Sequence, residues 1–135
     1  AAALDRLGED VLMSERLDPE WFVPQVGQGT LALEVRSTDA ATRELLATLN
    51  DHDAMSSLLA ERAFLRELGS GCSIPAGAFA TVRDGTISIN GVMLALDGAT
   101  SVRANFSGTE PEFVGRALAT TLRDELGGGE LAGWT

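Results

Sequence analysis

The sequence predicts an α+β fold in which a three-stranded antiparallel sheet packs against helices, preceded by one more strand and further helices. Three observations lead to this expectation. The pairs Asp84-Gly85 and Asp97-Gly98 are typical of the turns that join antiparallel strands. Apolar residues alternate with other residues on either side of these turns, as in a strand with one buried face. Apolar stripes at helical spacing come before the first strand and after the last.

The N-terminal third predicts separate pieces of structure rather than a unit of its own. Residues 1–8 read as the second half of a helix that stops at Gly8, followed by a connecting stretch to about residue 24. Residues 30–36 predict a strand, because three apolar residues alternate there with Ala, Glu and Arg. A short helix should follow to about Leu49. The apolar residues of this strand and helix are Leu31, Leu33, Val35, Leu45, Leu46 and Leu49.

The second half predicts a compact unit. A helix should begin at Asp53 and run to about Leu68, with its charged pair Glu61 and Arg62 on the solvent side. The final helix should begin at a capping box and run to about Leu126. The residues expected to mark these elements are Met55, Leu58, Leu59, Leu65 and Leu68 on the first helix, Ile87, Ile89, Met93, Val102, Ala104 and Phe106 on the strands, Thr109 and Glu112 in the capping box, and Val114, Leu118, Thr121 and Leu122 on the last helix.

Composition excludes several classes of function. The 135 residues carry a net charge of −10, with 20 acidic residues against 10 basic ones, which argues against nucleic-acid binding. We expect neither a membrane span nor a secretory signal, and therefore a cytoplasmic protein. All ten basic residues are Arg, so a lysine Schiff base is impossible. The single Cys and the single His rule out an internal disulfide and a Cys-rich zinc site, and no metal is expected.

Cys72 is the residue most open to a chemical role. It lies in a loop of small residues, 69–75, between the expected helix and the first strand. A loop can expose a thiol, and glycines leave room beside the sulfur. From the spacing alone, an inert, half-buried cysteine in a turn is the more common case. A thiol enzyme with His52 as its base is a further alternative, although Asp51 and Asp53 beside that histidine are more typical of a solvated helix start.

Four segments resemble the porphobilinogen deaminase family. They are Ala2-Ala3-Leu4-Asp5-Arg6-Leu7-Gly8, the strand Pro24-Gln25-Val26-Gly27-Gln28-Gly29-Thr30-Leu31-Ala32-Leu33-Glu34-Val35-Arg36, the helical Ala60-Glu61-Arg62-Ala63-Phe64-Leu65, and the loop Gly71-Cys72-Ser73-Ile74-Pro75-Ala76-Gly77-Ala78-Phe79-Ala80. They occur in the family's order and spacing, so the resemblance covers nearly the whole chain. Ser70 stands where the family often has glycine, and Ser73 and Ala76 replace larger residues.

The resemblance implies a three-domain parent enzyme. Residues 1–23 would end its second domain, residues 24–51 would be a strand and helix returning to its first domain, and residues 52–135 would form the C-terminal cofactor-attachment domain. The implied activity is that of hydroxymethylbilane synthase, a transferase of tetrapyrrole and haem biosynthesis. It polymerises four porphobilinogen molecules into hydroxymethylbilane and releases ammonia.

The resemblance also assigns site residues. Cys72 would carry the dipyrromethane cofactor through a thioether, and Gln28 and Gly29 would lie near that cofactor. No catalytic residue is assigned here, because the family's catalytic Asp and Arg cluster match no position in this sequence. We therefore expect the chain alone to be inactive, with porphobilinogen, the linear pyrrole chain and the N-terminal domains of the same protein as partners of the complete enzyme. The alternative is a non-enzymatic α+β binding module that reuses the domain.

Overall fold

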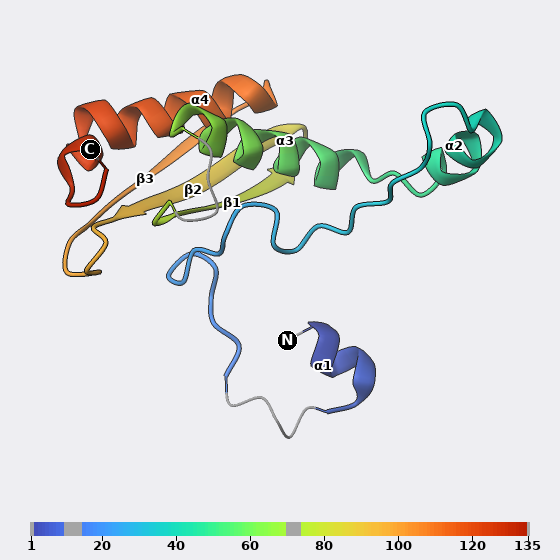
Figure 1. Cartoon of the computed structure of the whole chain (residues 1–135), viewed down its shortest axis with the longest axis horizontal. Coiled ribbons are helices and arrows are strands. Elements are labelled where there is room, and N and C mark those ends of the chain that lie inside the picture. Colours follow the sequence, from blue (N-terminus) through green and yellow to red (C-terminus); the bar gives the residue numbers. More distant parts are fainter. Residues whose placement is uncertain (1, 10–14, 70–73, 135) are drawn as a thin grey trace.

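The computed structural model describes residues 2–9, 15–69 and 74–134. Within them the elements follow one another as α1 (Ala2–Leu7), α2 (Ala40–Ala47), α3 (His52–Glu67), β1 (Ala76–Arg83), β2 (Thr86–Leu94), β3 (Ser101–Gly108), α4 (Pro111–Thr120), a π-helical turn (Thr121–Glu125) and a 3₁₀ turn (Gly128–Glu130). The α+β prediction is confirmed: β1, β2 and β3 form an antiparallel sheet, and α3 and α4 cover one of its faces (Figure 1).

The two hairpins form where the Asp-Gly pairs predict them. Asp84 and Gly85 both have positive φ, at 50° and 72°, which is the backbone geometry of a tight hairpin turn. Gly98 has φ 71°, and the Asp97 carboxylate accepts a bond from the Ala99 amide at 2.9 Å. The pairing register then sets Ala80 opposite Ile89 on one side of β2.

The core lies between the sheet and the two helices. Its largest fully buried side chains are Phe64, Ile87, Ile89, Met93, Val114, Leu118 and Leu122. Gly115 makes the contact between α3 and α4 unusually close, since a Cβ at that position would lie 2.0 Å from the carbonyl oxygen of Ala60. The two helices therefore pack almost backbone to backbone at this point.

Helix α3 differs from the prediction in its start and in its buried side. Asp51, not Asp53, caps it, accepting bonds from the Asp53 and Ala54 amides at 2.9 and 3.0 Å. The buried residues are Ala60, Glu61, Ala63 and Phe64, whereas Met55 and Leu59 of the expected stripe are exposed. The close approach of α4 explains the buried alanines, because only small residues fit where Gly115 meets the backbone of α3.

The start of α4 also differs. The predicted capping box of Thr109 and Glu112 is not formed: α4 starts at Pro111, and its N-cap residue Glu110 makes no side-chain capping bond. The Glu112 carboxylate instead meets Arg66 and Arg116, each at 3.4 Å. The two arginines thus give the Glu112 carboxylate partners other than the main-chain amides at the start of α4.

The expected strand at residues 30–36 is the largest error. These residues have no regular secondary structure, and Leu31 and Leu33 are 93% and 64% exposed. Leu45 of α2 and Leu49, two residues beyond the end of α2, are exposed as well, so these apolar residues of the expected helix are not buried. A strand needs a neighbouring strand for its hydrogen bonds, and in the described chain none lies beside this segment. Figure 1 shows α1 and α2 standing apart from the sheet.

Candidate functional site

The loop that contains Cys72 runs from α3 to β1. Residues 70–73, including Cys72, lie outside the described residues, but both ends of the loop are described. Gly69 follows α3 with φ 109°, a conformation that favours glycine. At the other end, the Pro75 carbonyl accepts a bond from the Leu94 amide of β2 at 2.8 Å. The loop is thus attached to two ordered elements of the C-terminal unit.

Arg123 fixes the first of these ends. Its guanidinium donates to the Glu67 carbonyl oxygen at 2.8 Å and to the Glu67 carboxylate at 3.3 Å. It also donates to the Asp124 carboxylate at 2.8 Å, and this bond raises the pKa of Arg123 and lowers the pKa of Asp124. A cation at the last carbonyls of a helix is favourable. Arg123 therefore holds the C-terminal end of α3, immediately before the Cys72 loop.

The segment from Val23 to Gly29 runs beside β1, just beyond the other end of the loop. The Pro24 carbonyl accepts a bond from the Ala78 amide at 3.1 Å. Gly77 makes room for this approach, because a Cβ there would lie 2.7 Å from the Pro24 oxygen. The residues before the turn at Gly27-Gln28-Gly29 thus lie against the C-terminal unit.

Glu61 joins this turn to the sheet. One carboxylate oxygen accepts a bond from the Gly27 amide at 2.7 Å, and the other accepts one from the Ala80 amide of β1 at 2.9 Å. Glu61 is only 7% exposed, and its burial raises the pKa of the carboxyl, while the two amide bonds oppose that rise. The expectation that Glu61 lies on the solvent side of its helix is therefore wrong. Two main-chain amides supply the partners that a buried carboxylate needs.

The predicted site residues Gln28 and Gly29 are both exposed. They follow Gly27, whose partner Glu61 lies seven residues before Leu68, about 10 Å along α3. Gln28 and Gly29 are thus separated by part of a helix from the described end of the Cys72 loop. His52 is exposed at the first residue of α3, and the 16-residue helix sets it about 24 Å from the loop end. His52 therefore lies at the opposite end of α3 from the described start of the Cys72 loop.

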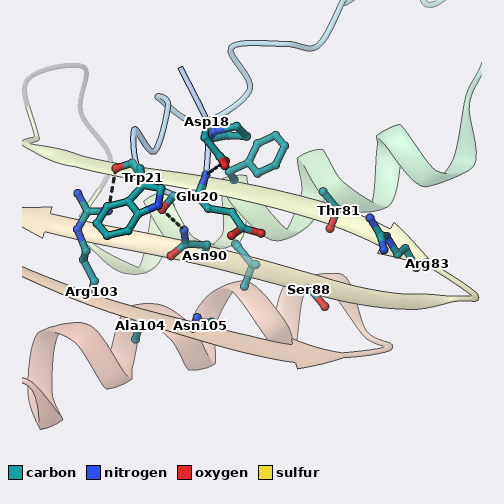
Figure 2. Close-up of a pocket in the computed structure, with 13 residues that line it drawn as sticks. Asp18, Glu20, Trp21, Thr81, Arg83, Ser88, Asn90, Arg103, Ala104 and Asn105 are labelled. Carbon is teal, nitrogen blue, oxygen red and sulfur yellow. Dashed lines mark hydrogen bonds between the residues drawn. The ribbon is translucent and has the colours of Figure 1, made fainter. Parts of the chain in front are cut away.

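The sheet face opposite the helices carries a groove of about 810 Å³, and Figure 2 shows its lining. The turn Asp18–Trp21 forms one wall. The Asn90 amide donates to the Glu20 carbonyl at 3.1 Å, and Arg103 donates to the Trp21 carbonyl at 3.0 Å. The Trp21 side chain itself is 81% exposed. These two bonds attach the segment before Pro24 to the middle and far strands.

The geometry defines an α+β domain in which the Gly27-Gln28-Gly29 turn is held beside β1 and the Cys72 loop begins at the end of α3. A family model described as "Porphobilinogen deaminase, C-terminal domain" matches residues 55–124. A second, described as "Porphobilinogen deaminase, dipyromethane cofactor binding domain", matches residues 1–44. The chain belongs to the porphobilinogen deaminase family, as its segments predicted.

Individual relatives agree with the two family models. The porphobilinogen deaminase of Roseiflexus castenholzii is 42% identical over 135 residues, which are 98% of this chain and 44% of the relative. Those of Trichlorobacter lovleyi and Bacillus pumilus are 40% and 38% identical over 93% of this chain, and 40% and 41% of their own lengths are covered. The chain thus spans less than half the length of the curated relatives it matches. No helix in the described ranges is long and apolar enough to cross a membrane.

Sequence reasoning missed Glu61 and Arg123. Both are charged residues on helices, where solvent exposure is the usual expectation. The small residues Ala60 and Ala63 on either side of the Glu61-Arg62 pair were the available signal, because small residues are typical of a closely packed helix face. For Arg123 no sequence signal exists, because its contact with Glu67 spans 56 residues and depends on the π-helical turn.

Proposed function

We propose that this chain is the C-terminal part of a hydroxymethylbilane synthase and that Cys72 carries its dipyrromethane primer. The complete enzyme would join four porphobilinogen molecules into hydroxymethylbilane, with loss of ammonia at each step. The observation that carries the proposal is the match to both family models, with Cys72 inside the range of the C-terminal one. The ordered loop ends support it, because a covalently held primer needs a fixed attachment point.

The attachment chemistry suits a thiol. The sulfur of Cys72 would form a C–S bond to a pyrrole methylene carbon as that carbon loses its C–N bond, and the thiol proton would leave with ammonia. The residues around the described loop ends are small, with Ala76, Gly77 and Ala78 at the start of β1. Gln28 and Gly29, at the neighbouring turn, are the residues of this chain that we propose to line the same group. The primer supplies the end from which the pyrrole chain grows.

Intact mass tests the attachment. The chain is coexpressed with a polypeptide that supplies the N-terminal half of the family, and its mass is compared with that of Cys72→Ser. We expect added mass equal to two linked pyrroles on the first and none on the second. Ser56→Ala, a matched change far from the loop, should retain the added mass. A bare Cys72 chain in the presence of the N-terminal half, or equal added mass on Cys72→Ser, would contradict the proposal.

We also propose the division into residues 1–23, 24–51 and 52–135, with the middle segment completing a preceding domain. One support is that Leu31 and Leu33, which alternate with other residues as in a strand, are exposed. Another is the gap between the two family matches, because the first ends at residue 44 and the second begins at residue 55. In the complete enzyme a neighbouring strand would supply the main-chain hydrogen bonds that a strand at residues 30–36 needs. Without that preceding part we expect the chain to form no hydroxymethylbilane.

Copurification tests this division. The double variant Leu31→Asp/Leu33→Asp should lose its association with the coexpressed N-terminal half, because two leucines can no longer be buried there. The stability of the isolated chain should not change, since both side chains are already exposed. Ala32→Asp, which would lie on the opposite face of the proposed strand, is the control. Equal copurification of the double variant and the unchanged chain would refute the assignment.

A further inference from the structure

Strand β1 forms the outer edge of the sheet. It pairs with β2 on one side only, which leaves alternate main-chain groups pointing outward. Two of these outward amides have partners from the chain's own N-terminal part and from α3. The Ala78 amide donates to the Pro24 carbonyl at 3.1 Å, and the Ala80 amide donates to Glu61 at 2.9 Å. The Glu61 carboxylate thus takes the position that the next carbonyl of a neighbouring strand would occupy.

The second oxygen of Glu61 reaches in the opposite direction. It accepts from the Gly27 amide at 2.7 Å, the shorter of its two bonds. Gly27 has φ 73° and lies against Leu58 of α3, so a side chain at this position would be strained and crowded. The turn closes with bonds from the Gln28 amide to the Gln25 carbonyl and from the Thr30 amide to the Gly27 carbonyl. One carboxylate therefore bonds both β1 and the first residue of the Gly27-Gln28-Gly29 turn.

The chemistry of this bridge requires two acceptors. A carboxylate offers one oxygen to each amide, whereas a glutamine side chain would present an NH₂ group to one of them. A buried amide without an acceptor is costly, so the weaker of the two contacts would open. Within the part of the chain that the structure describes, Glu61 has no ion pair, which leaves the two amides as its recorded partners.

We propose that Glu61 is a positioning residue that fixes the Gly27–Gly29 turn, and with it Gln28, at a set place on the edge of β1. The inference rests on the proposed function, in which Gln28, Gly29 and the Cys72 loop serve one cofactor. Helix α3 carries Glu61, which bonds to the turn, and its C-terminal end leads into the Cys72 loop. One helix therefore connects the turn and the loop. Loss of the bridge should leave the domain folded while the turn moves relative to the sheet.

Pulsed electron–electron double resonance on the whole 135-residue chain measures the position of the Gly27–Gly29 turn relative to the sheet. Cys72 is the only cysteine, so Cys72→Ser gives a background without thiols. Spin labels at Gln28→Cys and at Thr86→Cys, an exposed position on β2, then report the distance from the turn to the sheet. With Glu61 present we expect one narrow distance distribution. Glu61→Gln should at least double its width, and Glu112→Gln, the same change at an exposed carboxylate, should not.

Amide hydrogen exchange distinguishes movement of the turn from unfolding of the whole domain. In Glu61→Gln the core amides of Ile89 and Met93 should stay protected, while the Gly27 amide should exchange at least tenfold faster. An unchanged distance distribution would overturn the proposal, and so would loss of core protection, since Glu61 would then support the whole fold. Neither readout needs the cofactor. A chain that never gains cofactor mass would refute the proposed function and leave this inference to be decided by the distances.

Discussion

Gly115→Ala probes the closest contact of the fold. A Cβ at this position would lie 2.0 Å from the Ala60 carbonyl oxygen, 2.8 Å from the Phe64 nitrogen and 2.9 Å from the Ala63 Cβ. Two of these atoms belong to the backbone, so no side-chain rotation relieves the clash. Helices α3 and α4 would have to separate by at least about 1 Å. A gap of that size forfeits about a quarter to a half of the dispersion energy of the contacts that it opens.

The size of the effect follows from two opposing terms. Overpacking of a tight core costs about 1–3 kcal/mol and occasionally more, and a backbone clash of this depth belongs at the upper end. Replacing a helical glycine by alanine returns about 1 kcal/mol through helix propensity. We therefore expect the free energy of unfolding to fall by about 2 kcal/mol, a large share of the 5–15 kcal/mol typical of such domains.

Urea unfolding followed by circular dichroism measures this difference. The midpoint should fall while the dependence of free energy on urea stays the same, because the amount of surface exposed on unfolding hardly changes. Gly29→Ala is the matched control, since no atom lies within 4 Å of its Cβ position and its φ is not positive. It should change stability by less than about 1 kcal/mol. If Gly115→Ala is as stable as the unchanged chain, the close packing of α3 and α4 is wrong.

Three further predictions concern charged residues. Burial raises the pKa of Glu61 above its ordinary 4.5, so the folded state binds the proton more tightly. Stability should therefore fall as pH rises from 4.5 through the raised pKa, and Glu61→Gln should flatten this part of the profile in urea titrations at several pH values. Arg123→Met should lower the free energy of unfolding by about 1 kcal/mol, because it frees the end of α3, whereas Arg116→Met, at a more exposed pair, should cost less than about 0.5 kcal/mol. Equal costs for the two arginines would argue against the helix-end role. Asp51→Ala should cost about 1 kcal/mol by removing the cap of α3, as thermal unfolding would show, and no loss would mean that the cap is formed otherwise.

The C-terminal unit was largely predictable because its signals are local. The Asp-Gly pairs fix the hairpins, and the alternation of Ile87, Ile89 and Met93 fixes the buried face of β2. All three are among the core residues of the structure. A turn type and an alternation of buried and exposed residues depend on neighbours within a few positions. A short stretch of sequence is therefore enough to predict the hairpins and the buried face of β2.

The errors concern features whose causes lie far away in the chain. The strand at 30–36 has the right alternation but no strand to pair with in the described residues. The buried side of α3 depends on α4, about fifty residues later, whose Gly115 favours Ala60 and Ala63 over the leucines of the stripe. Glu61 could not be recognised as buried without the two amides, one 34 residues before it and one 19 residues after it. The fold brings these amides to Glu61, and the spacing of apolar residues along the sequence gives no information about such contacts.

The partners of the β1 edge also bear on aggregation. An open sheet edge invites a second copy to add a strand, which is how fibrils and swapped assemblies start. At Ala78 and Ala80 the outward amides are already bonded to Pro24 and Glu61. An incoming strand would first have to displace a buried carboxylate and a neighbouring stretch of the same molecule. The contacts of Pro24 and Glu61 with β1 therefore also make it harder for a second copy of the chain to add a strand at this edge of the sheet.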